Sequence, residues 1–380
     1  MLNRIKKKMI KIMTGERERQ FSSFKSLLYC VSIIYHCLAK YRAALYEKNI
    51  IKSKRLPTAV ISIGNITVGG TGKTPMTLYM AELVKNLGYE VVVISRGYKG
   101  ELEKTGGIVS NGKTVLMGPE KAGDEPFMLA CRLKNIPVVV GKNRFQAGMQ
   151  AVNKFKPDVI VLDDAFQHLK IKRDIDLVLL DSDNPFGNLH LLPRGVLREP
   201  LSALQRADAL IMTRTGRASE TEMEKPLAGL KEFIQSKPVF KTSHIPYAYI
   251  VKKEKYVSFE SISTSSFLHD FNFLKDRRVL AFAGIARNDD FLHTIESFKC
   301  DITDFIGFED HHRYSDSDLN RIFRLAEKAN AGFLITTEKD YAKLANKTTW
   351  PNDLIVIGIE ISFMNDSKAF ADIIKSTLSV

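Results

Sequence analysis

The chain has 380 residues, of which 44% are hydrophobic and 26% are charged. These proportions exclude a collagen-like or wholly disordered chain, and the length predicts two domains or one large one. The net charge of +13 gathers at one end, because residues 1–55 hold 14 Lys and Arg against 3 Glu, whereas the rest hold 42 basic against 40 acidic residues. Such clustering indicates a local contact with an anionic surface, and we expect no nucleic-acid partner.

The first informative segment is an apolar stretch at residues 26–39, flanked by Lys25, Lys40 and Arg42. As a helix it would rise about 21 Å, short of the roughly 30 Å hydrocarbon core of a bilayer. A helical projection separates a polar stripe from an apolar side: Lys25, Ser32, His36 and Lys40 against Phe24, Leu28, Val31, Tyr35 and Leu38. We predict a helix in the membrane interface, bound to anionic lipid. The alternatives are a helix packed on the protein's own core, a membrane span, or a cleaved signal peptide.

From Leu56 onward, apolar strand-like runs alternate with helical stretches. Strands are predicted at 59–63, 91–95, 137–140, 159–162, 177–180 and 209–213, with helices at 73–87 and 143–155. A second alternation has strands at 279–283, 333–336 and 354–358, with helices at 289–298 and 317–330. This order predicts parallel α/β sheets. We therefore expect a basic N-terminal segment (1–55), a larger α/β domain (56–215) and a smaller α/β domain (216–380), with a junction near residues 200–220. The four cysteines show no metal-like spacing, so a reducing compartment is the default.

A glycine-rich loop follows the first of these strands. It reads Gly69-Gly70-Thr71-Gly72-Lys73-Thr74 and leads into a predicted helix, which is the pattern of a P-loop. Backbone amides of such a loop bind phosphate oxygens, Lys73 would reach the β and γ phosphates, and the Thr74 hydroxyl would bind Mg²⁺. The common pattern has Gly where Thr67 stands. A simple glycine turn is the structural alternative, but strand, loop and helix together favour a nucleotide site at residues Thr67, Val68, Gly69, Gly70, Thr71, Gly72, Lys73 and Thr74.

Carboxylates mark three further positions. Asp163 and Asp164 end an apolar strand, where P-loop proteins hold Mg²⁺; a cap of the next turn is the alternative. Asp124 precedes a predicted helix and is either its N-cap or a general base at a loop tip.

His311 and His312 follow Asp310, and Ser315 with Asp318 predicts a capping box there. The adjacent histidines lack zinc-ligand spacing, so a role near phosphate or beside a base is favoured.

The ordered set of motifs resembles the tetraacyldisaccharide 4′-kinases, the lipid A kinases of Gram-negative bacteria. The residues that carry this resemblance lie at 64–75, 95–98, 123–126, 162–168, 197–200, 282–286, 310–312 and 336–340. The resemblance covers essentially the whole chain, and its specificity comes from the set rather than from any one motif. In that family Thr at the position of Thr67 is usual, and Ala165 stands here where Gly is usual.

The resemblance implies a fold, a reaction and roles for residues. The fold is a P-loop NTPase-like parallel sheet domain with a second, smaller α/β domain and an N-terminal membrane-associated helix. The reaction uses ATP and Mg²⁺ to phosphorylate the 4′-hydroxyl of a tetraacylated glucosamine disaccharide 1-phosphate at the cytoplasmic face of the inner membrane. Asp124 is then the base, assisted by a histidine that follows an aspartate, and this assigns the role to His311, after Asp310, rather than to His312. Asp163, Asp164 and Thr74 take the metal.

Three further side chains are candidate contacts to nucleotide, sugar or phosphate: Arg96, His168 and Arg198. Surface ion pairing is the alternative for both arginines. The partners implied are the glycolipid substrate and anionic inner-membrane lipid, with no obligate protein partner. The rival function is a membrane-associated P-loop NTPase that acts on a different substrate or as an accessory protein, including a nucleotide-binding module without catalysis.

Overall fold

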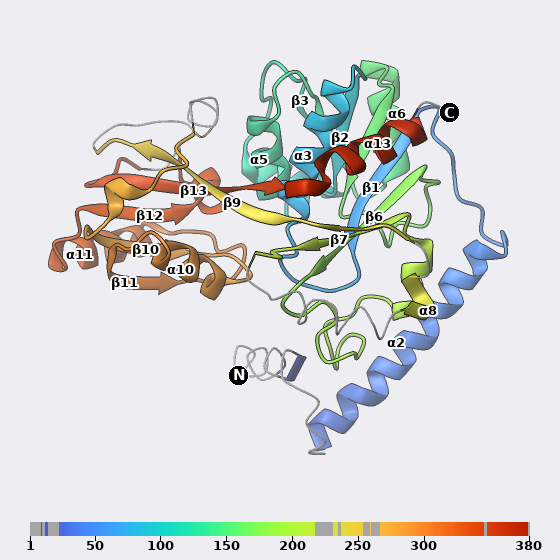
Figure 1. Cartoon of the computed structure of the whole chain (residues 1–380), viewed down its shortest axis with the longest axis horizontal. Coiled ribbons are helices and arrows are strands. Elements are labelled where there is room, and N and C mark those ends of the chain that lie inside the picture. The colour runs from blue at the N-terminus through green and yellow to red at the C-terminus, as the bar shows by residue number, and fades with distance from the viewer. Residues whose placement is uncertain are drawn as a thin grey trace.

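Two sheets organise the chain. The computed structural model describes residues 9, 12–13, 23–216, 231–234, 237–253, 259, 267–345 and 348–378. Within them, an eight-stranded sheet with flanking helices forms the first unit and a five-stranded sheet forms the second, smaller unit (Figure 1). This confirms the predicted α/β class with two sheet units and an N-terminal helix.

The first sheet places β1, the strand before the glycine-rich loop, among parallel neighbours. Its strand order is β3-β4-β2-β5-β1-β6-β7-β8, and only β3 runs antiparallel to its neighbour. In β1, Ile63 pairs with Asp163 of β5 and with Leu177 of β6, so the carboxyl ends of the three strands meet at one edge. The strands are β1 (Ala59–Asn65), β2 (Val91–Ser95), β3 (Gly107–Ser110), β4 (Val138–Val140), β5 (Val159–Asp163), β6 (Ile175–Asp181), β7 (Ala209–Thr213) and β8 (Val239–Lys241).

Helices cover both faces of this sheet, as continuous apolar strands require. One face packs against α3 (Lys73–Asn86), α5 (Asp124–Arg132) and α13 (Ser367–Leu378). The other packs against α6 (Arg144–Phe155), α8 (Lys231–Ile234) and the 3₁₀ helix η2 (Leu201–Arg206). Asn143 caps α6 through its side chain, which accepts from the amide of Gln146. The short α4 (Pro119–Ala122) and η1 (Glu101–Glu103) precede α5.

The second sheet has the order β11-β10-β12-β13-β9 and is parallel except for the edge strand β9. The edge position explains why β9 was not recognised in the sequence: Pro246 lies within it, and proline is tolerated in edge strands. The strands are β9 (Ser243–Val251), β10 (Arg278–Ala283), β11 (Asp301–Gly307), β12 (Phe333–Thr337) and β13 (Asp353–Ser362). The helices and 3₁₀ turns are α10 (Asn288–Glu296), α11 (Asp316–Lys328), α12 (Glu338–Leu344), η3 (Asn272–Leu274) and η4 (Met364–Asp366).

The change of sheet falls at Thr242, between β8 and β9. The β9–β13 ribbon then runs from the second sheet toward the first unit, and α13 returns to pack on the first sheet (Figure 1). Phe363 and Phe370 stack with ring centroids 4.1 Å apart, and both lie near Tyr79 of α3. The predicted junction near residues 200–220 precedes this point, and residues 217–230 lie outside the described part of the chain.

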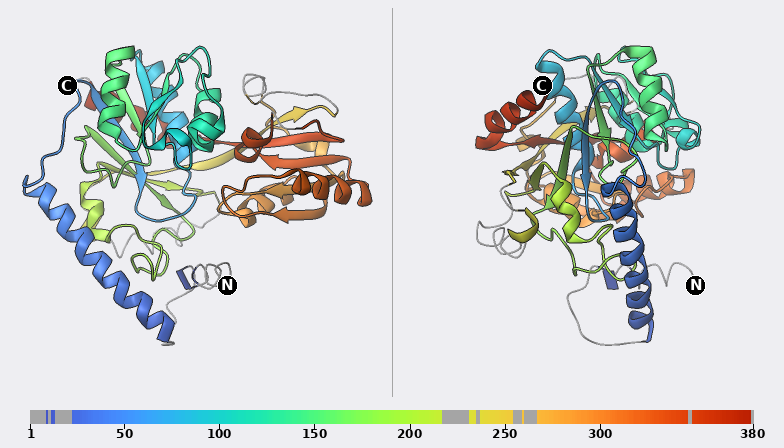
Figure 2. Two further views of the ribbon diagram at one scale, coloured as in Figure 1. Left: turned by 180° about the vertical axis from the view of Figure 1, so that it is seen from behind. Right: turned by 90° about the vertical axis from the view of Figure 1, so that its right-hand side faces the viewer.

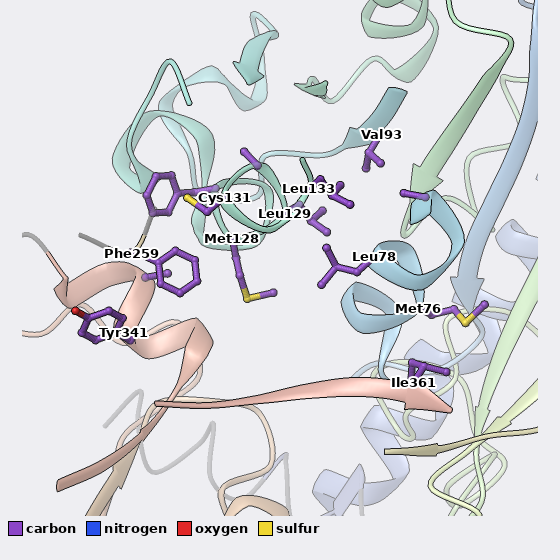
Figure 3. Close-up of a cluster of buried hydrophobic side chains, with 14 of the residues drawn as sticks. Met76, Leu78, Val93, Met128, Leu129, Cys131, Leu133, Phe259, Tyr341 and Ile361 are labelled. Carbon is purple, nitrogen blue, oxygen red and sulfur yellow. The ribbon is translucent and has the colours of Figure 1, made fainter. Parts of the chain in front are cut away.

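One apolar core joins the two units. The cluster shown in Figure 3 brings Met128 and Leu129 of α5 together with Leu78 of α3, and extends to Tyr341 of α12 and to Phe259. Phe259 lies with its ring centroid 6.1 Å from those of Phe127 and Tyr341. The helix that carries Asp124 therefore packs against both sheets' helices at once.

The N-terminal helix α2 (Ser23–Glu47) is longer than predicted and runs along one side of the first unit, away from the second sheet (Figures 1 and 2). The expected two-sided division is wrong for Leu28 and Ser32, which are both buried against the protein body. A separate stripe of the helix is exposed: Leu27, Val31, Ile34, Leu38 and Tyr41. In the described residues, no helix is both long and apolar enough to cross a bilayer.

Candidate active site

A cavity of about 1440 Å³ lies where the carboxyl edge of the first sheet faces the second unit. The glycine-rich loop and the ends of β2 and β5 line it from the first unit, while α12 and the loops after β10 and β11 line it from the second. Ligands of open α/β sheets bind at this carboxyl edge, so this cavity is the candidate ligand-binding site.

The glycine-rich loop has the backbone geometry that its sequence predicts. Gly69 and Gly72 have φ angles of 118° and 84°, in the region that favours glycine, and Gly72 is the N-cap of α3. A Cβ built on Gly69 or Gly70 would meet no atom within 4 Å. The loop therefore surrounds open space at a helix N-terminus, which suits the phosphates of a nucleotide.

Hydrogen bonds fix the shape of this loop. The Asn65 amide donates to the Thr71 hydroxyl at 2.9 Å, and the Thr213 hydroxyl donates to the Thr71 carbonyl at 3.2 Å. The amide of Val68 donates to the Val196 carbonyl at 2.8 Å, and Thr67 forms a β-bridge with Leu197. Thr67 and Val68 therefore attach the loop to residues 196–197.

Asp163 is buried at the end of β5. Its two carboxylate oxygens accept hydrogen bonds from Thr77 at 3.2 Å and from Ser95 at 2.9 Å. Burial, together with the nearby carboxylates of Glu125 and Asp164, raises the pKa of Asp163 to about 6. A carboxylate held in such a place gains from a nearby cation.

Asp164 has the opposite electrostatic setting. It lies in the left-handed region, with φ 47°, and its Oδ1 is 2.8 Å from Arg198 and 3.8 Å from Lys73. Burial alone would raise the pKa of Asp164, but Lys73 and Arg198 outweigh it and hold that pKa below its usual value. Lys73 of the loop thus already faces the carboxylates at the end of β5.

Asp124 of the first unit and His311 of the second are in contact, and His311 lines the cavity. Asp124 is the first residue of α5, whose N-cap is Gly123, so the aspartate makes no side-chain cap. Its Oδ2 lies 3.1 Å from Nδ1 of His311, in the loop after β11. Burial would raise the pKa of Asp124, yet the hydrogen bond from His311 and the charges of Lys343 and Lys339 lower it. Asp124 is therefore an ionised carboxylate.

His312 has a different environment from His311. Its Nε2 lies 3.1 Å from Asp318, and its ring stacks on Phe308 with centroids 4.6 Å apart. Ser315 and Asp318 form the predicted capping box of α11, which is confirmed. Only His311 of the two adjacent histidines contacts Asp124.

The three candidate contact residues, Arg96, His168 and Arg198, all line the cavity. Arg96 pairs with Glu103 at 2.8 Å and packs over the ring of Tyr98, 5.7 Å from its centroid. Burial and the surrounding cations, Arg144 first among them, lower the pKa of His168 to about 4, so its imidazole is neutral near pH 7. Arg198 lies between Asp164 and Gln167.

Comparison with known proteins decides the family. The sequence pattern of the tetraacyldisaccharide-1-P 4′-kinases matches residues 24–379. A tetraacyldisaccharide 4′-kinase from Desulfatibacillum aliphaticivorans is 40% identical over 356 residues, 93% of each chain, and one from Syntrophus aciditrophicus is 43% identical over 85% of each. The crystal structure of the "apo" form of LpxK from Aquifex aeolicus in complex with ATP has a TM-score of 0.71 at 32% identity, covering 93% of this chain and 99% of that one.

The chain belongs to the tetraacyldisaccharide-1-P 4′-kinase family. It is an ATP-dependent kinase, and the resemblance first indicated by its motifs is confirmed.

Several residues of this kinase line the cavity, although the local sequence pattern does not predict this. Tyr35 of α2 donates to the Arg198 carbonyl at 2.9 Å, and Arg42 donates to the Gln167 carbonyl at 3.2 Å. The N-terminal helix thus borders the cavity as well as the outer surface. On the other side, Arg214 at the end of β7 donates to the Gly70 carbonyl, and its Asp181 partner also pairs with Arg287 of the second unit.

Lys339 is the missed residue closest to the Asp124–His311 pair. It lies in the first turn of α12, and its Nζ is 3.2 Å from Glu125 and 3.3 Å from Asp310. Its motif, Thr337-Glu338-Lys339-Asp340, stood among those that resemble the family, but a strand-end turn explains such a sequence equally well. Only the packing of α12 against α5 brings the lysine to the site.

Proposed function

We propose that this kinase transfers the γ-phosphoryl group of ATP to the 4′-hydroxyl of tetraacyldisaccharide 1-phosphate, and that the cavity between the two units is where the transfer occurs. The observation that carries this proposal is that His311, the partner of Asp124, lines the same cavity as the glycine-rich loop and Lys73. A carboxylate base beside that histidine and a phosphate cradle on the same cavity are the parts that phosphoryl transfer to an alcohol requires.

The glycine-rich loop would hold the donor. Backbone amides at the N-terminus of α3 face the open space beside Gly69 and Gly70, which suits the phosphates of ATP. Lys73 would leave its 3.8 Å contact with Asp164 for the γ-phosphate, where its charge stabilises the transition state. We place ATP at residues 67–74, with Thr67 and Val68 supporting the loop.

The donor set at the end of β5 fits Mg²⁺. In the described residues, no three His, Cys, Asp or Glu side chains gather as an all-protein metal site. Mg²⁺ in kinases is held instead by one or two carboxylates together with substrate phosphates and water. Asp163, Asp164 and the Thr74 hydroxyl are the oxygen ligands that we assign, and the raised pKa of buried Asp163 suits a site completed by a cation. When bound, the ion would neutralise charge on the phosphates.

Asp124 would act as the general base. The sugar O–H bond breaks as its proton passes to the Asp124 carboxylate, the oxygen forms a bond to the γ-phosphorus, and the bond from that phosphorus to the β,γ-bridging oxygen breaks to release ADP. His311 keeps the carboxylate oriented through its Nδ1, 3.1 Å away. Positioning of this kind is a large part of the rate in phosphoryl transfer.

The acceptor would enter from the side of the cavity that α2 borders. Arg198 and His168 lie on that side, and Arg96 lies beyond the end of β2. We assign these three side chains to contacts with the sugar, its 1-phosphate or the nucleotide. His168 is neutral near pH 7 and so offers a hydrogen bond rather than a charge.

The exposed stripe of α2 would hold the enzyme at the cytoplasmic face of the bacterial inner membrane, as a peripheral or monotopic protein. Its five large apolar residues face away from the protein body, and residues 1–55, which include this helix, carry the excess of positive charge. Such a helix binds anionic lipid surfaces through both features. We infer that residues 1–55 bind the membrane, that residues 56–215 bind nucleotide, and that residues 216–380 complete the cavity.

The proposal is tested by following γ-labelled phosphate from ATP into a tetraacyldisaccharide 1-phosphate acceptor in detergent. We expect label in the glycolipid, and none in an analogue that lacks the 4′-hydroxyl. Lys73→Ala should remove transfer, with the surface variant Lys328→Ala as a matched control that keeps it. ATP hydrolysis that is indifferent to the acceptor would overturn the proposal in favour of an NTPase with another role.

A further inference from the structure

Lys339 has three partners at the site and three protons to donate. Its Nζ lies 3.2 Å from Glu125 Oε1, 3.3 Å from Asp310 Oδ1 and 3.4 Å from His311 Nε2. Burial alone would lower the pKa of Lys339, but the two carboxylates raise it above its usual value, so the side chain is an ammonium ion. An ammonium group donates hydrogen bonds and accepts none.

The two ring nitrogens of His311 consequently have different roles. Because Nε2 faces a pure donor, it is the nitrogen that accepts and carries no proton. Nδ1 then carries the proton and donates to Asp124 Oδ2, 3.1 Å away. The reverse tautomer would direct an N–H at the Lys339 ammonium and the Nδ1 lone pair at a carboxylate, and both contacts would be repulsive.

We propose that Lys339 is a positioning residue of the kinase, which donates to Nε2 of His311 and so holds the ring with Nδ1 toward Asp124. This inference rests on the proposed function, in which Asp124 is the base. It gives the Thr337–Asp340 turn a role, because no residue of this turn takes part in the proposed transfer itself.

The same turn also holds the backbone of His311. Thr337 caps α12 by accepting from the amide of Asp340, whose buried carboxylate accepts from the amide of Gly284 at 2.9 Å. The carbonyl of Gly284 in turn accepts from the amide of His311 at 3.2 Å, and His311 has a φ of 61°. A single helix start thus fixes both where the histidine lies and which of its nitrogens bears the proton.

Charged and titratable groups surround His311 from three directions. Asp124 faces it from α5, Asp310 precedes it with Oδ2 3.8 Å from Nε2, and Lys339 faces it from α12. Glu125 pairs with Lys339, and Lys343 pairs with Asp340. The ring of Tyr98 lies edge-on, with centroids 5.6 Å apart. Lys339 is the cation within hydrogen-bond distance of the imidazole in the described part of the chain.

The test is steady-state phosphate transfer by Lys339→Met. Without the ammonium beside Nε2, the imidazole is no longer held with Nδ1 toward Asp124, so kcat should fall by about 10- to 100-fold while the KM for ATP stays close to wild type. Lys339→Arg, which keeps a cationic donor, should restore kcat.

Other outcomes separate this inference from simpler roles. A loss of kcat that Lys339→Arg does not restore would mean a merely structural lysine, and a higher KM for ATP with an unchanged kcat would mean a phosphate contact. Either result, or a wild-type kcat in Lys339→Met, overturns the proposal. Thermal unfolding checks that the variant is folded, and Lys328→Met is the surface control. The proposed function fails separately, if wild-type enzyme transfers no phosphate or if Asp124→Asn transfers it normally.

Discussion

Asp163 and Asp164 are neighbours in the chain whose ionisation has opposite effects on stability. Burial raises the pKa of Asp163 to about 6, whereas Lys73 and Arg198 outweigh burial and lower the pKa of Asp164. A raised carboxyl pKa means that ionisation costs stability as the pH rises through the folded pKa. A lowered pKa means that the charge adds stability, which is lost as the pH falls through the folded pKa.

We therefore expect opposite stability changes from two conservative substitutions at pH 7.5, without metal or nucleotide. Asp163→Asn should raise the melting temperature, with a gain of about 1–3 kcal/mol, because it removes a buried charge while the Thr77 and Ser95 hydroxyls can still pair with the amide. Asp164→Asn should lower it, because Arg198 and Lys73 lose their partner. Calorimetry with a chelator measures both, and shifts of the same sign would contradict the assignment. Both variants should lose most kinase activity.

For single residues, the sequence predicts which side chains are chemically important better than it predicts which side chains they contact. Lys73, Asp124 and the Asp163–Asp164 pair could be named because each follows a strand or loop with a recognisable pattern. The roles of Lys339 and Arg132 could not, since each pairs with a glutamate more than 200 positions away and their own surroundings read as an ordinary turn and helix. The choice of His311 over His312 also needed the structure, which shows that only the former contacts Asp124.

Among elements, α2 departs most from its predicted form. The pattern of residues predicts its helical period, but not that the protein body buries Leu28 and Ser32, because its packing partners lie far along the chain, as in the contact of Tyr29 with His190. Six strands of the first sheet were predicted to within about two residues, since continuous apolar runs leave little choice. The short β3 and β8, the edge strands β9 and β11, and α12 and α13 were missed because their patterns are brief or mixed.

The exposed stripe of α2 predicts a membrane-binding phenotype. The triple change Leu27→Ser, Ile34→Ser and Leu38→Ser should lower partitioning onto vesicles of anionic phosphatidylglycerol about 100-fold, if each side chain loses roughly 1 kcal/mol of burial. Leu116→Ser, at an exposed leucine outside the helix, serves as the control. Co-sedimentation measures binding, and unchanged binding by the triple variant would exclude this stripe as the membrane contact.

Across the whole molecule, a buried ionic cluster joins the two units beside the shared apolar core. Arg132, at the end of α5, donates to Glu338 at 3.1 Å and to the Tyr249 hydroxyl at 3.0 Å. The Tyr247 hydroxyl completes the cluster by donating to Glu338 at 2.7 Å. Asp124 begins the helix that Arg132 ends, so this cluster sets how α5 lies against the second unit.

We expect Arg132→Met to lower the free energy of unfolding by about 3–5 kcal/mol, because it leaves the Glu338 carboxylate buried without its cation. The double variant Arg132→Met with Glu338→Gln should recover part of that loss, since no buried charge is then unpaired. Thermal unfolding of wild type should also be a single transition, because one core spans both units. Two separate transitions, or a double variant less stable than Arg132→Met, would contradict this view.

The most direct test of the account measures Asp124→Asn in a single turnover with labelled ATP and the disaccharide acceptor. We predict ATP affinity close to wild type, because Asp124 belongs to α5 and not to the glycine-rich loop, and a transfer rate lower by about 100- to 10,000-fold, the usual contribution of a general base. A transfer rate within a few-fold of wild type would show that the carboxylate at the start of α5 does not take the sugar proton.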